Sequence, residues 1–204
     1  METTTAETTT TTTTLEVSPC IWDLATHAGR EHGRYSRPGV GIWRTNGITY
    51  ASATDGRRAA VLEREDPGDD VAPFVIPREA LQGNKPKAAE DKIQIVFEGN
   101  QGAIHTRGAI VPFQSADDSF PPVQDVIDNA ERHIDANETD SAIGVDPKFI
   151  AEAGTLADRY IKRHAEGEVC ARWSHGRANH PLVIYIRGHD DSRLRIAIMP
   201  CKLP

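Results

Sequence analysis

The sequence predicts an α+β fold in which short helices cover one face of antiparallel sheets. The first observation is a pattern that occurs three times, in which an apolar residue is separated by one residue from a proline that opens a helix. The three segments are Val17-Ser18-Pro19, Val75-Ile76-Pro77 and Val145-Asp146-Pro147. The second observation is that strand-like runs follow each opening. Short helices that open antiparallel meanders are typical of α+β proteins, so we expect a unit of strand, helix and three strands, used three times.

The first unit is expected to begin near Leu15, after a Thr-rich segment of residues 1–14 that we expect to be disordered. Ser18 is a good N-cap, and Pro19 suits the first helical position because its missing N–H would have no partner there. A hairpin turn is expected at Thr45-Asn46-Gly47. The strands predicted for this unit are Val40–Trp43, Thr49–Ala53 and Arg58–Leu62.

The second unit opens at Pro77 with a helix that must be short, because Gly83 and Pro86 follow it closely. Its meander is expected to turn at Gly99–Gly102. The strands predicted for this unit are Ile93–Phe97, Ala103–Arg107 and Ala109–Phe113.

The third unit opens with the longest predicted helix, which Asp146 caps and Pro147 begins. Its apolar residues recur on one helical face: Phe149, Ile150, Ala153, Leu156, Tyr160 and Ile161. The strands predicted after it are Val169–Trp173, Leu182–Arg187 and Arg193–Met199, with a turn at Gly188–Ser192. Two polar stretches between the units, Asp66–Asp70 and Asp125–Ser141, are predicted to be linkers.

These units predict the domain organisation of the chain. Residues 15–128 are expected to form one domain from two half-units, 15–65 and 71–128. Residues 129–204 are expected to hold a linker and a third half-unit.

Composition narrows the classes of function. The net charge of −7 argues against a protein that coats nucleic acid through its total charge. No apolar run approaches the roughly 18 residues that span a membrane, and the Thr-rich start has neither the basic region nor the apolar core of a signal peptide. We therefore expect no membrane partner. The three cysteines lie far apart without a CxxC pair, so we expect a reducing cytoplasm.

Four short motifs follow one another along the chain: Ala53–Ala60, Val75–Leu81, Phe120–Ile127 and Ile198–Leu203. Together they resemble motifs of bacterial DNA sliding clamps, the DNA polymerase III beta subunits. Ala53–Ala60, which reads ATDGRRAA, resembles the signature of the clamp's central domain. Val75–Leu81 resembles the strand, proline and helix that open the second half of that domain, and Phe120–Ile127 resembles the segment that closes it. The end of the chain, Ile198–Leu203, resembles the terminal tail of the clamps. The resemblance covers about residues 15–204.

The resemblance implies a hydrophobic groove that binds short linear peptides of DNA polymerases, clamp loaders and repair proteins. The implied groove residues are Thr54, Gly56, Arg57, Arg58 and Ala59 from the first motif, Pro121 and Val126 from the third, and Met199, Pro200, Cys201, Lys202 and Leu203 from the tail. Methionine and proline offer an adaptable apolar floor, and arginine can pair with acidic or carbonyl groups of a peptide.

The resemblance also implies helices that face double-stranded DNA and contact its phosphates without reading bases. The residues expected to do so are Arg30, Arg34, Arg37, Lys85, Lys87, Arg159, Lys162 and Arg163. A simpler interpretation is that some of these cations only complement helix dipoles, and nearby acids such as Asp23 and Asp158 dilute the positive charge.

Some features depart from the clamp pattern and leave alternatives open. Ala59 stands where the family usually has leucine, Cys201 replaces a usual methionine, and the chain is shorter than a clamp subunit. A closed ring would need a homo-oligomer, whereas a monomeric clamp mimic would compete for partner peptides without circling DNA. A metal-dependent hydrolase is the third alternative and the least favoured, because the eight histidines match no known zinc spacing. We therefore expect a non-enzymatic protein without metal or cofactor.

Overall fold

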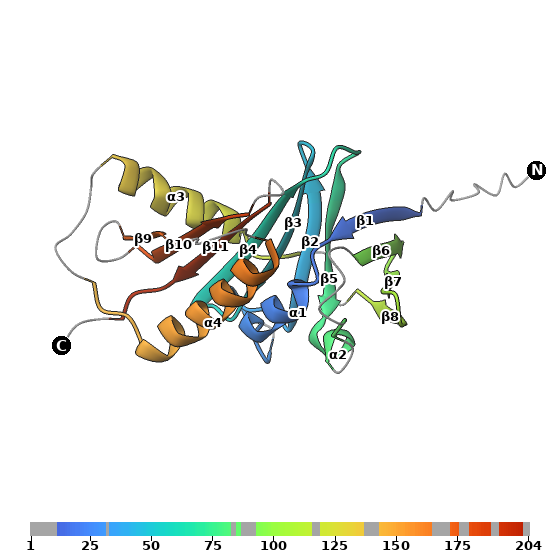
Figure 1. Cartoon of the computed structure of the whole chain (residues 1–204), viewed down its shortest axis with the longest axis horizontal. Coiled ribbons are helices and arrows are strands. Elements are labelled where there is room, and N and C mark those ends of the chain that lie inside the picture. Colours follow the sequence, from blue (N-terminus) through green and yellow to red (C-terminus); the bar gives the residue numbers. More distant parts are fainter. Residues whose placement is uncertain are drawn as a thin grey trace, which may run out of the picture.

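A computed structural model describes residues 12–31, 33–82, 85–86, 93–115, 119–136, 143–164, 172–175, 180–188 and 192–201. Its strands form two antiparallel sheets (Figure 1). The smaller sheet contains, in spatial order, β1 (Thr13–Val17), β6 (Ile93–Glu98), β7 (Gln101–His105) and β8 (Ile110–Gln114). The larger sheet contains, in spatial order, β5 (Val71–Pro77), β2 (Gly39–Thr45), β3 (Ile48–Thr54), β4 (Arg58–Glu65), β11 (Ser192–Ile198), β10 (Leu182–Arg187) and β9 (Arg172–His175).

The first two units exchange their opening strands. β1 leaves its own unit and pairs with β6, where Leu15 lies opposite Ile95, while β5 pairs with β2, where Phe74 lies opposite Ile42. The third unit joins the larger sheet through β11, which pairs with β4 over its whole length. The three meanders predicted from the sequence are therefore present, and two of them lie in one continuous sheet.

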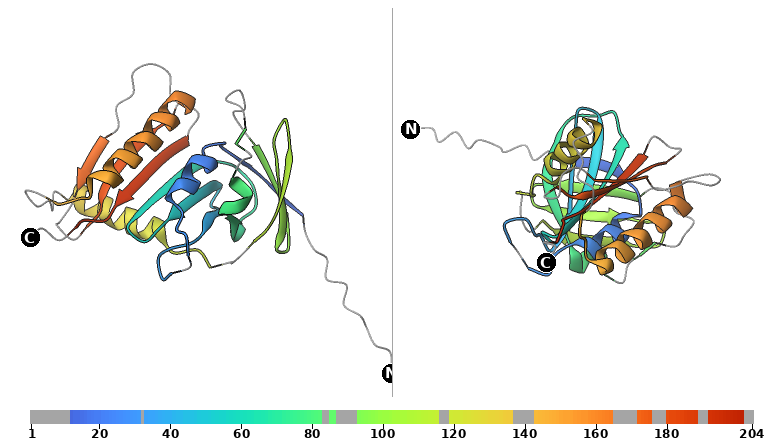
Figure 2. Two further views of the ribbon diagram at one scale, coloured as in Figure 1. Left: turned by 90° about the horizontal axis from the view of Figure 1, so that it is seen from below. Right: turned by 90° about the vertical axis from the view of Figure 1, so that its left-hand side faces the viewer.

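The helices are α1 (Ile21–Leu24), continued by the 3-10 turn η1 (Ala25–His27), α2 (Arg78–Leu81), α3 (Val123–Asp135) and α4 (Pro147–His164). Figure 2 shows α3 and α4 on opposite sides of the strands. Apolar residues of α1, α2 and α4 share one core with the sheets, as predicted. None of the described helices is long and apolar enough to cross a membrane.

The alternation of side chains along a strand explains how one sheet packs against a different helix on each face. On β11, Ile196 belongs to the core shared with α4, and its neighbour Ala197 belongs to the second core, which contains Val123 and Ile127 of α3. Successive side chains of a strand point to opposite faces, so α3 covers the face that α4 leaves open.

The prediction of a linker over Asp125–Ser141 was wrong for the part that forms α3. The apolar residues of α3 recur at Val123, Ile127, Ala130 and Ile134, with the spacing of one helical face. Acidic residues lie between these apolar residues, so the composition of the stretch indicated a polar linker. Helices therefore lie on both faces of the larger sheet, although only one face was expected to carry them.

Two further boundaries differ from the sequence predictions. Strand β1 begins at Thr13, within the segment expected to be disordered, because Thr13 and Thr14 pair with Phe97 and Val96 of β6. The strand predicted from Val169 is described only from Arg172, and residues 169–171 lie outside the described residues.

A candidate peptide-binding groove

An apolar groove of about 320 Å³ lies where three segments predicted from separate motifs come together. Seven of the predicted residues line it: Thr54, Gly56, Arg58, Ala59, Pro121, Val126 and Met199. The sequence did not indicate the other lining residues, which are Tyr35, Pro122, Val123, Ile127 and Ala197. Val126 and Met199 are 41% and 38% exposed, so the groove presents apolar surface to solvent.

The first wall is the tight turn after β3. The carboxylate of Asp55 accepts hydrogen bonds from the N–H groups of Arg57 and Arg58, both at 3.0 Å. The hydroxyl of Thr54 accepts the N–H of Gly56 at 3.1 Å. Gly56 has a φ of +85°, a conformation that side chains disfavour and glycine adopts readily. Local side-chain capping and one glycine thus hold this wall in place.

Tyr35 adds an aromatic side to the turn. The hydroxyl of Thr54 lies 3.0 Å from the carbonyl oxygen of Tyr35, and Ser36 and Asp55 form an isolated bridge. Tyr35 is 50% exposed. Its place in the groove depends on backbone contacts of an irregular segment, which sequence patterns do not reveal.

The second wall is the segment from Phe120 into α3. Phe120 packs directly on Gly41, where a Cβ atom would collide with the aromatic ring. The rings of Phe120 and Trp43 lie 6.0 Å apart. The guanidinium of Arg37 donates to the carbonyl oxygen of Ser119 at 3.0 Å. These contacts fix the chain just before Pro121, Pro122 and the first turn of α3.

An ionic cluster centred on the buried Arg195 and Glu63 holds α3 against the sheet. The guanidinium of Arg195 on β11 pairs with Glu63 on β4, with Asp128 at 2.6 Å and with Glu131 at 3.0 Å. Burial lowers the pKa of Arg195, but the adjacent Glu63 carboxylate outweighs it and the net pKa is raised. The cluster therefore stays charged and ties the second wall to the strands that carry the first and third walls.

The third wall is the tail after β11. The N–H of Met199 donates to the carbonyl oxygen of Arg57, and the N–H of Cys201 donates to that of Gly144, both at 2.8 Å. Met199 lines the groove, whereas Pro200 and Cys201 do not line it. The predicted groove residues Lys202 and Leu203 lie outside the described residues.

The two arginines of the first motif differ from the expectation that both pair with a peptide. Arg58 lines the groove, yet its guanidinium is buried and contacts Glu152, with Asp55 at 3.1 Å. It also donates to the carbonyl oxygen of Thr26 at 3.2 Å. Arg57 is exposed and does not line the groove. Arg58 therefore has a structural role, because its charge already has acidic partners within the chain.

The floor between the walls is formed by small residues. Ala59 on β4 and Ala197 on β11 are buried and paired in register, and both belong to the core that α3 covers. A larger side chain at residue 59 would extend into the space that the groove occupies. The alanine that departs from the clamp pattern thus contributes to the volume of the groove.

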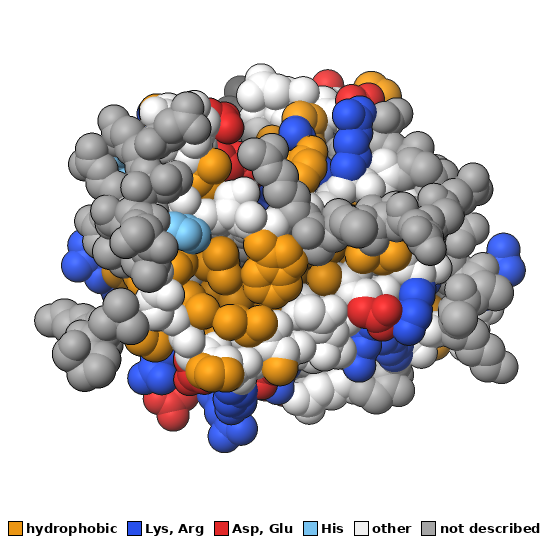
Figure 3. All heavy atoms as spheres, turned by 60° about the vertical axis from the view of Figure 1, so that its left-hand side comes forward, with side chains coloured by type: hydrophobic (Ala, Val, Ile, Leu, Met, Phe, Trp, Pro, Cys, Tyr) orange, Lys and Arg blue, Asp and Glu red, His pale blue; other side chains and the backbone are white. Residues whose placement is uncertain are grey.

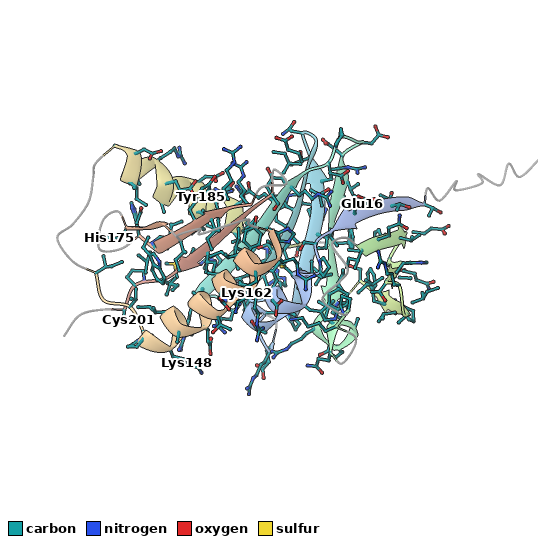
Figure 4. All side chains as sticks on the ribbon, in the orientation of Figure 1. Glu16, Lys148, Lys162, His175, Tyr185 and Cys201 are labelled. Atoms are coloured by element: carbon teal, nitrogen blue, oxygen red, sulfur yellow. The ribbon has the colours of Figure 1, made fainter. Side chains whose placement is uncertain are left out.

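Several cations expected to contact DNA are paired with acids. Lys85 and Arg159 both bind the buried Asp23 carboxylate of α1, at 2.7 and 2.5 Å. Lys162 pairs with Asp158 at 2.8 Å on the outer side of α4, where Figure 4 labels it.

The remaining cations of that set are scattered. Arg37 binds backbone carbonyl oxygens, and Arg30 and Arg34 are exposed. Burial raises the pKa of the Cys20 thiol, and the nearby charge of Arg163 opposes this rise only in part. Lys87 lies outside the described residues. Within the described parts of the chain, no group of three or more His, Cys, Asp or Glu residues could hold a metal ion.

Comparisons with solved structures identify the fold. The chain aligns over 100% of its length with 68% of a DNA polymerase III beta subunit from Thermotoga maritima, with a TM-score of 0.62 and 16% sequence identity. The chain has the sliding-clamp fold. A sliding clamp from Bacillus subtilis aligns over 94% of this chain and 65% of its own, with a TM-score of 0.67 and 13% identity.

A third sliding clamp comes from Pseudomonas aeruginosa and was solved with a ligand. It aligns over 93% of this chain and 66% of its own, with a TM-score of 0.60 and 14% identity. This chain thus spans about two thirds of the length of these clamps. No protein-family model matches the chain, and no curated protein is similar to it in sequence. The likeness to sliding clamps therefore concerns the fold.

Proposed function

We propose that this protein is a non-enzymatic, clamp-like interaction module that binds short linear peptides of DNA replication or repair proteins in the groove. The observation that carries the proposal is the meeting of the turn after β3, the start of α3 and Met199 around one apolar hollow. A groove lined by apolar residues with a few fixed polar groups is suited to a short hydrophobic segment.

The chemistry of the walls supports a peptide with apolar anchors. Val126 and Met199 offer exposed apolar side chains, and Ala59 and Ala197 leave room between them. The buried Arg58 is neutralised by acids, so hydrophobic contact rather than charge pairing would supply most of the affinity.

The experiment is a titration of the full chain with a fluorescently labelled peptide from the clamp-binding segment of a bacterial DNA polymerase, followed by anisotropy. Val126→Asp should weaken binding by at least about tenfold, because it places a charge on an apolar wall. Ile110→Asp is the matched control, since Ile110 is 64% exposed on β8 and lies outside the groove. Equal affinity of the two variants would argue against the groove as the peptide site.

DNA contact is the less supported part of the clamp-like role. The pairing of Lys85 and Arg159 with Asp23 favours a second candidate, a regulator that binds the same peptides without holding DNA. Titration with labelled double-stranded DNA at low salt separates the two. A clamp that holds DNA should bind with an affinity that falls steeply as salt rises, whereas the regulator should show no such binding.

A further inference from the structure

The floor of the groove is a row of small side chains across three adjacent strands. Thr54 of β3 lies opposite Ala59 of β4, and Ala59 lies opposite Ala197 of β11. All three residues are buried and line the groove. The neighbouring row on the same face of the sheet pairs Val61 with Arg195, whose larger side chains are buried beside α3. The side chains of β4 and β11 thus become smaller where the hollow begins, and the two alanines set its depth.

The walls above this floor suit an aromatic side chain. Tyr35 offers an aromatic ring, and pairs of rings attract one another beyond the apolar area that they bury. Met199 offers a thioether, whose sulfur makes favourable contacts with ring edges. Both side chains are partly exposed, so an incoming group can reach them. Tryptophan fills a hollow of about 320 Å³ better than leucine does, and space left unfilled forfeits van der Waals contacts.

Two exposed cations border the first wall of the groove. The guanidinium of Arg34 lies 5.1 Å from the centre of the Tyr35 ring, and Arg57 directly follows the lining residue Gly56. Exposed cations attract an acidic ligand and repel a basic one. Figure 3 turns forward the end of the molecule that carries the tail after β11, where hydrophobic side chains gather and Lys and Arg side chains stand at the margins.

We propose that the groove selects a peptide in which a residue of tryptophan size enters the hollow over Ala59 and Ala197, with an acidic neighbour that meets Arg34 or Arg57. The inference rests on the proposed function and specifies which peptides the groove prefers. The alanine pair selects the size of the anchoring residue, and the arginines select the charge beside it. Because Ala59 departs from the leucine of the clamp pattern, the size preference belongs to this chain rather than to the fold.

The first test uses two versions of the labelled polymerase-derived peptide, in which the largest apolar residue is replaced by tryptophan or by leucine. The wild-type chain should bind the tryptophan peptide at least about tenfold more tightly. Ala59→Leu should reverse this preference by filling the hollow, and its retained binding of the leucine peptide shows that the variant is folded. Ala197→Val is a second variant with a smaller added side chain, and it should reduce the preference.

The outcomes separate this inference from the proposed function. Equal affinity of the wild-type chain for the two peptides would overturn the size selection and leave the groove as a peptide site. Binding of neither peptide would contradict the proposed function and this inference with it. If Ala59→Leu binds neither peptide, Ala197→Val decides, and an unchanged preference in that variant would overturn the role of the alanine pair.

The second test concerns charge and uses tryptophan peptides with aspartate or lysine beside the anchor. The aspartate peptide should bind about tenfold more tightly at low salt, and the difference should shrink as salt rises. Arg34→Gln and Arg57→Gln should each reduce the difference by about threefold. Arg107→Gln is the matched control, because Arg107 is exposed before β8 of the other sheet. Equal binding of the two peptides by the wild-type chain would overturn the charge selection.

Discussion

The backbone N–H of Met199 donates a 2.8 Å hydrogen bond to the carbonyl oxygen of Arg57. The two residues lie far apart in the sequence, and this bond joins the tail after β11 to the turn before β4. It extends the pairing of β11 with β4, in which Ile198 lies opposite Arg58. The groove therefore depends on a continuous sheet that brings two distant motifs together.

Replacing Met199 with proline should detach the tail from the turn, because proline has no N–H to donate. We expect a loss of about 1 kcal/mol in the free energy of unfolding and a fall of roughly tenfold in peptide affinity. Met199→Leu is the control, since it keeps the N–H and the apolar bulk. Urea denaturation and peptide anisotropy measure the two effects. Equal stability and affinity of the two variants would show that this hydrogen bond contributes to neither.

Gly56→Ala should distort the first wall, because the φ of +85° is disfavoured for alanine. We expect destabilisation of about 1 kcal/mol and weaker peptide binding. Gly108→Ala is the control, because Gly108 has no positive φ and a Cβ there meets nothing within 4 Å. Thermal unfolding of the two variants provides the comparison. A Gly56→Ala protein as stable as wild type would contradict the claim that the positive φ at residue 56 strains an alanine.

Gly41→Ala should displace Phe120 and with it the second wall, because the new methyl group collides with the aromatic ring. Overpacking of this kind costs about 1–3 kcal/mol. Gly154→Ala is a control of opposite sign, since a Cβ at this position of α4 meets open space and alanine favours helix by about 1 kcal/mol. Chemical denaturation should therefore rank Gly154→Ala above wild type and Gly41→Ala below it.

The buried His27 should make the protein less stable as the pH falls. Burial, with a smaller contribution from Arg58, lowers the pKa of His27 from 6.5 to about 4. The unfolded chain therefore binds a proton below pH 6.5 that the folded chain does not bind until about pH 4. Stability is complete above pH 6.5 and declines toward pH 4, by roughly 3 kcal/mol in total.

The measurement for His27 is the free energy of unfolding by urea at several pH values. His27→Gln should flatten the profile between pH 6.5 and 4 relative to the wild-type chain. A slope that persists in the His27→Gln protein would assign the acid sensitivity to another group.

The repeated units could be predicted from the sequence because they depend on local signals, whereas the groove residues were implied by the resemblance of four motifs to those of sliding clamps. Pro147 begins α4 and Pro77 immediately precedes α2, as their fixed backbone favours, and Gly56 marks a turn that needs a positive φ. Such residues reveal local geometry without knowledge of the fold. The prediction of α4 succeeded for a similar reason, since its apolar face is long and regular. Helix α1 instead begins at Ile21 with Cys20 as its N-cap, so the prediction of Ser18 as N-cap and Pro19 as the first helical residue was wrong.

The parts that the sequence did not reveal depend on tertiary contacts. The apolar stripe of α3 is narrow and interrupted by acids, yet Asp128 and Glu131 meet Arg195 in the folded chain. Tyr35 enters the groove through a backbone contact with Thr54. The buried role of Arg58 follows from its contact with Glu152, a residue of another unit. None of these pairings has a local pattern that could predict it.

The most direct test of the groove is a map of amide chemical shifts of the full chain during titration with the polymerase-derived peptide. The account predicts that the largest changes cluster at Gly56, Ile127 and Met199, while Ile110 on β8 and the amides of β7 remain unchanged. Binding accompanied by changes confined to residues outside the groove, or saturating peptide without any change at these three residues, would contradict it.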